Sequence, residues 1–244
     1  MARQVGAIRL VGTMGGISFT RDGQAKTLPG RRPVTAQRTR ENNLEFGRAA
    51  RTSKIIRKAL SPLEVAPRGL HNRITSLIRQ KAFQLDTASS RGQRFLSRNA
   101  ALTLLAEFDL NSASPFEAIF PGKVTIDQSG TSLKNIQGNN LRGEDIKAPT
   151  GATHVQVRTV VAGITSTASE ITITTDPVIG ASAEIPLDAT EITFASNPGV
   201  SATDPNGNVF NIAGISFKFY QQVATRYYRL ENGIYDVGKI IFVG

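Results

Sequence analysis

The 244-residue chain contains no cysteine. Disulfide bonds, thiolate metal sites and cysteine nucleophiles are therefore excluded, and the redox compartment stays open. No run of about 18 apolar residues occurs, so we expect no membrane-spanning helix. The first residues lack the apolar segment of a Sec signal. This predicts synthesis in the cytoplasm and leaves incorporation into a virion or an extracellular assembly open.

Reaction chemistry is equally scarce in this sequence. Only two histidines occur, His71 and His154, and we expect the first near a helix start and the second in a strand of another domain. A general base needs a partner and a pocket, so both read as ordinary surface or packed residues. No Gly-x-Ser-x-Gly, Walker A, dinucleotide-binding or His-Glu-x-x-His motif is present. The sequence predicts a protein that is not an enzyme, with no cofactor, no metal and no small-molecule substrate.

Acidic residues are few in the first part of the chain. Residues 1–110 carry 20 Lys and Arg against 7 Asp and Glu, a net charge of +13, whereas residues 111–244 carry 9 against 12, a net charge of −3. Sixteen of the 20 basic residues are arginine. Because the planar guanidinium forms paired hydrogen bonds with carboxylates and phosphates, this bias favours docking to an anionic partner.

The first 28 residues have the pattern of extended chain. Asp22-Gly23 follows the strand-like segment 17–20 and is a strong hairpin signal. The glycines of residues 12–16 lack the lysine and helix of a phosphate-binding loop, so we interpret them as a bend between strands. Residues 29–33 are expected to form a linker.

A basic helix over about residues 35–60 is the strongest feature. At 100° per residue, one face collects the residues expected in the core: Phe46, Ala49, Ala50, Ser53, Ile56 and Leu60. The opposite face collects the candidate polyanion-binding or partner-binding residues: Arg40, Arg48, Arg51, Lys54 and Lys58. A solvated amphipathic face would explain most such helices. Leu44 and Ile55 nevertheless lie among the cations, and we assign them to a subunit contact.

A second helix is expected over about residues 71–85, with apolar residues at helical spacing, and one or two helical turns within residues 89–108. Beyond residue 111, Thr, Val, Ile and Gly dominate and turn signals recur. Strand-like runs are predicted at 123–127, 153–162, 170–175, 190–194, 209–220, 225–230 and 238–243. Seven short strands of this kind are typical of a β-sandwich.

The end of the chain has an aromatic pattern with two interpretations. Ile215, Phe217 and Phe219 alternate with polar residues, as in a half-buried strand. Residues 217–233 could form a ligand platform. The simpler interpretation is a hairpin with its aromatic residues on the core face.

These elements together predict the α+β class. The expected order is an N-terminal hairpin or arm at 1–33, a basic helical domain at 34–110, a linker with short strands at 111–150 and an antiparallel Ig-like β-sandwich at 151–244.

Several short segments carry a resemblance. They are Gly12 to Phe19 with Arg21-Asp22-Gly23, Thr39 to Asn43 with Glu45-Phe46-Gly47, Gly151 to His154, and Phe219 to Gln222 through to Glu231-Asn232-Gly233. In these the chain resembles proteins of Bacteroidetes bacteria and their phages that have a basic helical part and a C-terminal Ig-like domain. The resemblance implies a bacterial or phage origin, a two-part architecture and a place in a large assembly. It carries over no catalytic residues.

Two functional hypotheses follow. The first is a non-enzymatic, self-assembling structural protein of a virion, tail-like structure or filament, whose partner is another copy of the chain. The second is a sequence-independent DNA- or RNA-binding protein that uses the basic helix, since clustered cations release counterions from phosphates. A carbohydrate- or protein-binding module would rest on the fold class alone.

Overall fold

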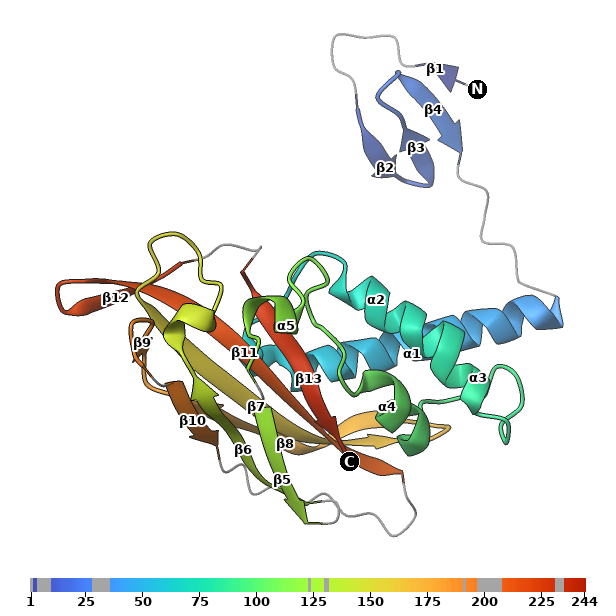
Figure 1. The fold of residues 1–244 in the computed structure, drawn as a ribbon. Coiled ribbons are helices and arrows are strands. Elements are labelled where there is room, and N and C mark those ends of the chain that lie inside the picture. Colours follow the sequence, from blue (N-terminus) through green and yellow to red (C-terminus); the bar gives the residue numbers. More distant parts are fainter. Residues whose placement is uncertain are drawn as a thin grey trace. The chain divides into compact units, whose positions relative to one another are not determined.

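The structure is a computed structural model. It describes residues 2–3, 10–27, 36–122, 124–129, 132–190, 192–196, 208–230 and 235–244. The chain divides into two compact units, residues 1–40 and residues 41–244. We call them the first unit and the second unit, and Figure 1 shows the elements of each.

The first unit is a small antiparallel sheet in the order β1-β4-β3-β2. Its strands are β1 (Ala2–Arg3), β2 (Gly12–Met14), β3 (Ile17–Phe19) and β4 (Gln24–Thr27). Gly15 and Gly16 form the turn between β2 and β3, and both have positive φ. Thr20 closes the β3–β4 turn around Asp22-Gly23. Its amide donates to Gln24 O, and its carbonyl oxygen accepts a hydrogen bond from the Gly23 amide. The predicted bend and hairpin are confirmed, whereas the expected linker at 29–33 lies outside the described residues.

The helices begin with α1 (Gln37–Ala59), which matches the predicted basic helix. The predicted second helix is a continuous run of α2 (Leu70–Leu77), the π-helical η2 (Ile78–Ala82) and α3 (Phe83–Leu85). In the third region, α4 (Arg98–Leu105) starts where Ser97 Oγ accepts a hydrogen bond from the Ala100 amide. The remaining short helices are η1 (Ser61–Leu63), α5 (Phe116–Ile119) and η3 (Gly143–Asp145). No described helix is long and apolar enough to cross a bilayer.

The central sheet has β11 in its middle and is antiparallel throughout. β11 (Val209–Val223) pairs with β7 (His154–Ser166) on one side, and with β12 (Arg226–Arg229) and β13 (Val237–Val243) on the other. β7 also pairs with β8 (Ile171–Ala181) and β9 (Ile185–Pro186). A second sheet has the order β10-β6-β5 and consists of β10 (Ile192–Ser196), β6 (Ser132–Leu141) and β5 (Val124–Ser129).

The two faces of the central sheet bury two different cores. Even-numbered residues of β7 such as Val160 and Ile164 pack with the helices in the first cluster. Odd-numbered residues such as Val155 and Val161 pack with α5 and the three-stranded sheet in the second cluster. This is the alternation expected of a strand covered on both faces. The α+β class is confirmed, and the helices share a core with the strands across the predicted boundary at residue 110.

The segment after α1 explains why β11 is not half-buried as predicted. Gly214, Ser216 and Lys218 form its polar face, and the last two are at most 2% exposed. Ser216 Oγ donates to Leu63 O at 2.9 Å, and Lys218 Nζ donates to Glu64 O at 2.7 Å. Residues 61–64 therefore cover this face through hydrogen bonds, which the alternation pattern alone could not reveal.

Candidate functional site

The buried face of α1 is turned relative to the prediction. Ala49, Ser53 and Ile56 are fully buried as expected, but Phe46 is 54% exposed. Glu45 lies inside instead, where its carboxylate accepts a hydrogen bond from the Gly92 amide at 3.0 Å. Because a buried carboxylate needs such donors, the loop around residue 92 sets the orientation of this half of the helix.

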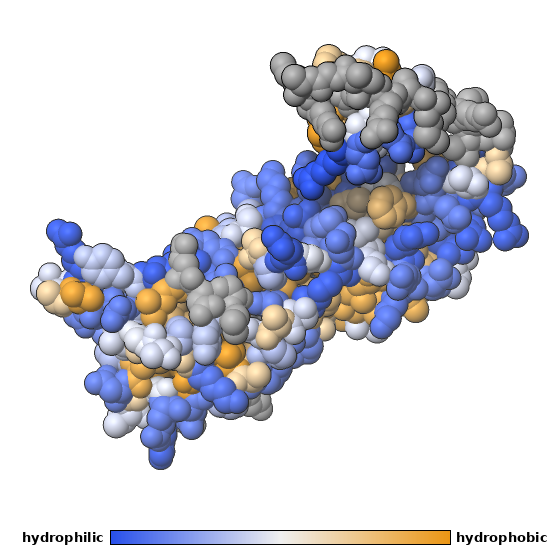
Figure 2. Space-filling model, turned by 90° about the horizontal axis from the view of Figure 1, so that it is seen from above, coloured by the Kyte–Doolittle hydropathy of each residue, from blue (hydrophilic) through white to orange (hydrophobic). Residues whose placement is uncertain are grey.

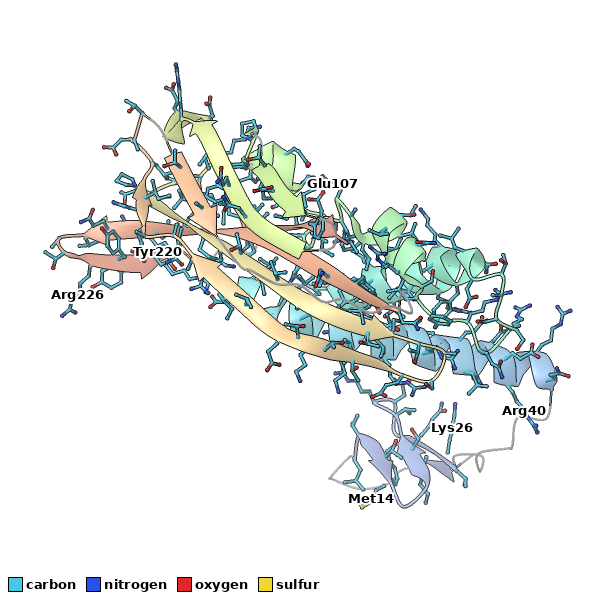
Figure 3. All side chains as sticks on the ribbon, turned by 90° about the horizontal axis from the view of Figure 1, so that it is seen from below. Met14, Lys26, Arg40, Glu107, Tyr220 and Arg226 are labelled. Carbon is cyan, nitrogen blue, oxygen red and sulfur yellow. The ribbon has the colours of Figure 1, made fainter. Side chains whose placement is uncertain are left out.

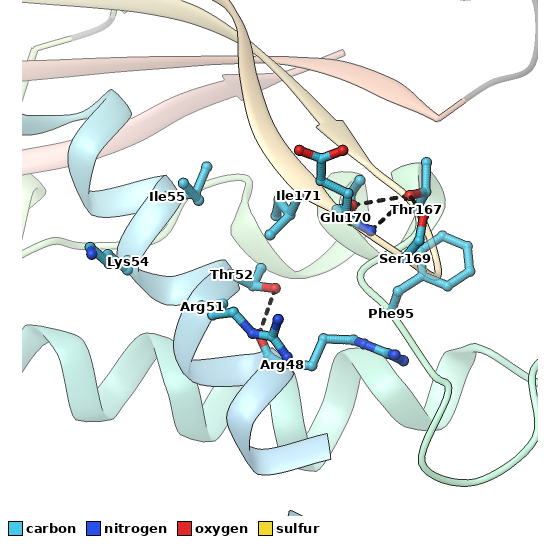
Figure 4. Close-up of a pocket in the computed structure, with 11 residues that line it drawn as sticks. Arg48, Arg51, Thr52, Lys54, Ile55, Phe95, Thr167, Ser169, Glu170 and Ile171 are labelled. Atoms are coloured by element: carbon cyan, nitrogen blue, oxygen red, sulfur yellow. Dashed lines mark hydrogen bonds between the residues drawn. The ribbon is translucent and has the colours of Figure 1, made fainter. Parts of the chain in front are cut away.

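A groove runs between α1 and the turn that joins β7 to β8, and it encloses about 330 Å³. Figure 4 shows its two walls, with the basic side chains on the helix and hydroxyl-bearing residues on the turn. We call it the basic groove. It is lined by Arg48, Arg51, Thr52, Lys54 and Ile55 of α1, by Phe95, and by Ser166, Thr167, Ser169, Glu170 and Ile171 of the hairpin.

The basic groove brings together four of the seven predicted site residues. Arg48, Arg51, Lys54 and Ile55 line it. Ile55 is half-buried against the first cluster, and this explains an apolar residue among cations, because the β7–β8 hairpin packs beside it.

The other three predicted residues lie elsewhere on α1. Arg40 is exposed in the first turn of the helix, and Lys58 is exposed in its last turn. Leu44 is 57% exposed and does not line the groove. Their assignment to partner binding and to a subunit contact stays a prediction.

Two arginines lie close together in the groove. Arg48 Nη1 donates to Arg94 O at 2.8 Å, and Arg51 Nε donates to Gly47 O at 3.3 Å. Partial burial lowers the pKa of Arg48, the charge of Arg51 lowers it further, and Glu45 raises it.

The one carboxylate of the groove is Glu170, on the opposite wall. Its amide donates to Thr167 Oγ1 at 3.0 Å, which fixes the turn. Among the ion pairs of the described residues, none within 4.0 Å joins Glu170 to Arg48, Arg51 or Lys54. The arrangement can hold an anion by charge and hydrogen bonds.

Sequence reasoning missed the second wall of this groove. Residues 166–171 join two predicted strands, and nothing in their composition indicates that they lie against α1. The only available signal was Ile55, whose position among cations indicated that something packs there.

A hairpin formed by the end of β11 and β12 extends beyond the central sheet. Figure 3 shows it running from Tyr220 at its base to Arg226 near its tip. β7 starts at His154, opposite Tyr220, so the residues further along have no β7 partner. Tyr227 and Tyr228 are consequently exposed, 41% and 52%, although the simpler interpretation placed the aromatic residues on the core face.

The histidines do not form a catalytic pair. His71 is exposed at the start of α2, and His154 is buried in β7. Nδ1 of His154 lies 2.9 Å from Thr153 Oγ1. The His154 and Tyr227 rings meet edge-on, with their centroids 4.9 Å apart. In the part of the chain that the structure describes, no three His, Cys, Asp or Glu side chains gather as they would around a metal ion. That the protein is not an enzyme stays a prediction.

Comparisons with family models, curated proteins and solved structures find no match to this chain.

Proposed function

We propose that the chain is a non-enzymatic structural subunit of a large assembly, of the virion, tail-like or filament kind. The first unit carries this proposal. In its described residues 10–27 only Gly23 is buried, while Val11 and Met14 are 63% and 64% exposed. Small sheets without an apolar core are marginally stable in water. Apolar side chains displayed on such strands are suited to burial against another subunit.

The hairpin of β11 and β12 supports the same function. It presents Val223, Tyr227 and Tyr228 to solvent on a two-stranded ribbon. In Figure 2, hydrophobic side chains lie among hydrophilic ones at the end of the second unit that carries β12. Exposed tyrosines of this kind are enriched in protein interfaces.

Charge gives a further argument for contacts between copies. Residues 1–110 have a net charge of +13 and residues 111–244 a net charge of −3. Regions of opposite net charge in two copies attract each other, which favours their encounter.

The test is sedimentation velocity and negative-stain microscopy of the purified chain over a range of concentrations. We expect large species that Val11→Ser combined with Met14→Ser disperses. Ile179→Ser is the matched control, because Ile179 is 58% exposed on β8 of the second unit. A wild-type chain that remains monomeric at the highest concentration contradicts the proposal.

Nucleic-acid binding is the second candidate, and α1 favours it. Arg51, Lys54 and Lys58 are exposed along the helix, and the ion pairs of the described residues include none of them. Three phosphate contacts predict roughly a 40-fold loss of affinity between about 50 and 200 mM salt.

Fluorescence anisotropy with labelled duplex DNA and single-stranded RNA measures this binding. Reversing the three charges to Glu is expected to abolish it, whereas Lys147→Glu, at an exposed site of the second half, leaves most of it. Affinity that is independent of salt would exclude this mode.

A further inference from the structure

The basic groove combines two chemistries that a nucleic-acid backbone does not require together. One wall carries the charges of Arg48, Arg51 and Lys54. Apolar side chains lie beside them: Ile55 and Ile171 are half-buried against the first cluster, and Phe95 is half-buried on the loop before α4. An ion in this space would therefore contact cations and hydrocarbon at once.

The charges in the groove are out of balance. Three cations face one carboxylate, Glu170, with which none of them forms an ion pair within 4.0 Å among the described residues. Arg48 and Arg51 repel each other. A bound anion would relieve this repulsion and accept hydrogen bonds from the free guanidinium nitrogens.

We propose that the basic groove binds a small amphipathic anion, in which a carboxylate or phosphate group is joined to an apolar body. The anionic group lies at Arg51 and Lys54, and the apolar body lies against Ile55, Ile171 and Phe95. A volume of about 330 Å³ is at the lower end of small-molecule sites. This site does not depend on the proposed assembly, because all its walls belong to the second unit of one chain.

The chemistry of the cations favours an oxyanion over other ligands. Arginine presents several N–H donors in one plane, which matches the two oxygens of a carboxylate or the oxygens of a phosphate. On the opposite wall, Thr167 Oγ1 already donates to Glu170 O at 3.1 Å, so the Ser169 hydroxyl is the group there that can turn to donate to the same oxygens. A neutral apolar molecule would leave Arg51 and Lys54 without an ion pair among the described residues.

Isothermal titration at low salt with hexanoate, hexyl phosphate and hexanamide tests the proposal. Either anion is expected to bind at least tenfold more tightly than the neutral amide of the same length. Tighter binding of hexanoate identifies a carboxylate ligand, and tighter binding of hexyl phosphate identifies a phosphate ligand. Equal affinity for hexanamide, or no binding of either anion at millimolar concentration, overturns the proposal.

The length of the ligand's apolar body and a pair of substitutions, at Arg51 and Lys58, make the test specific. Lengthening the carboxylate from acetate to hexanoate is expected to tighten binding about fourfold per CH₂, until the groove is filled. Arg51→Gln is expected to weaken hexanoate binding about tenfold, whereas Lys58→Gln, which removes the same charge from α1 outside the groove, leaves it unchanged. Both residues are exposed, so we expect both variants to fold, which circular dichroism checks. If the two substitutions weakened hexanoate binding equally, the anion would be held by the general charge of the helix, and the proposed site would be wrong.

Discussion

The two units of this chain use the same secondary structure in opposite ways. In the second unit, the central sheet buries both faces, one against helices and one against a second sheet. In the first unit, the described strands of three or four residues at β2, β3 and β4 leave most of their side chains exposed. Hydrogen-bonded strands are present in both, so the units differ in apolar burial, which dominates folding, and we expect the second unit to be the more stable.

The largest effect is expected in the second cluster, at the point where the rings of Phe116, Phe120 and Phe217 pack together. Phe120 is fully buried, with its ring centroid 4.4 Å from that of Phe217. Phe120→Ala is expected to lower the free energy of unfolding by about 3–5 kcal/mol, since it removes apolar contacts and leaves a cavity. Urea unfolding followed by tyrosine fluorescence measures it, because all four tyrosines lie in the second unit.

Phe19→Ala provides the contrast for that measurement, because Phe19 is a half-buried ring in β3 of the first unit. Its substitution is expected to leave the same transition unchanged. A comparable loss at Phe19 would mean that the two units unfold together.

A pair of glycines gives the next largest contrast. A Cβ atom at Gly214 would lie 2.7 Å from Leu63 Cδ1 and 3.3 Å from Lys239 O. Gly214→Ala is expected to cost about 1–3 kcal/mol by overpacking.

Gly47→Ala is the control, because nothing lies within 4 Å of its Cβ position. In α1 it is expected to stabilise by about 0.5–1 kcal/mol through helix propensity. Thermal unfolding should shift in opposite directions for the two variants. If both variants lost stability, the space around the added Cβ atom would not determine the change in stability.

The stability of the second unit should depend on pH through Glu64. Burial alone would raise the pKa of Glu64, but hydrogen bonds and charge from Arg158 and Arg229 outweigh it and hold the pKa below the ordinary 4.5. The resulting stability is present above that value and is lost as pH falls through the folded-state pKa.

Glu64→Gln is expected to destabilise by about 0.5–1 kcal/mol at neutral pH, since the carboxylate is partly exposed. The difference from wild type should disappear in urea titrations as the pH falls through the folded-state pKa of Glu64. A constant difference at every pH would show that the charge of Glu64 is not responsible.

The smallest effect on folding is expected in the first unit. Met14 extends away from its strands (Figure 3). Met14→Ser should change the unfolding of the second unit by less than about 0.5 kcal/mol, as is usual for an exposed site. The tyrosine signal used for Phe120 measures this change. A shift of several degrees in the melting temperature would show that Met14 contributes to the core of the isolated chain.

The sequence patterns predicted most of the fold. Each of the seven strand-like runs coincides with a strand, because alternating β-branched residues between turn signals are a local property. β6 was missed, since Gly138-Asn139-Asn140 is typical of a turn. In the structure Gly138 lies in the strand, and a Cβ there would be 2.2 Å from the Phe194 ring. This glycine is required by close packing with β10, a contact between residues far apart in sequence.

The sequence predicted one wall of the basic groove, on α1, and not the other. Helical periodicity grouped Arg48, Arg51 and Lys54 correctly, because their spacing depends on one helix. It misplaced Phe46, since the orientation of α1 depends on the bond between Glu45 and the Gly92 amide. The opposite wall at Thr167 and Glu170 depends on tertiary packing, which periodicity does not report.

The position of β11 has a consequence for how this protein is made. Residues 209–223 supply part of both clusters and pair with β7 and β13. A ribosome therefore releases α1 to α4 long before the surface that covers them exists. Contacts across such sequence distances slow folding and leave intermediates open to aggregation. The nascent chain should need a chaperone until residue 243 has emerged.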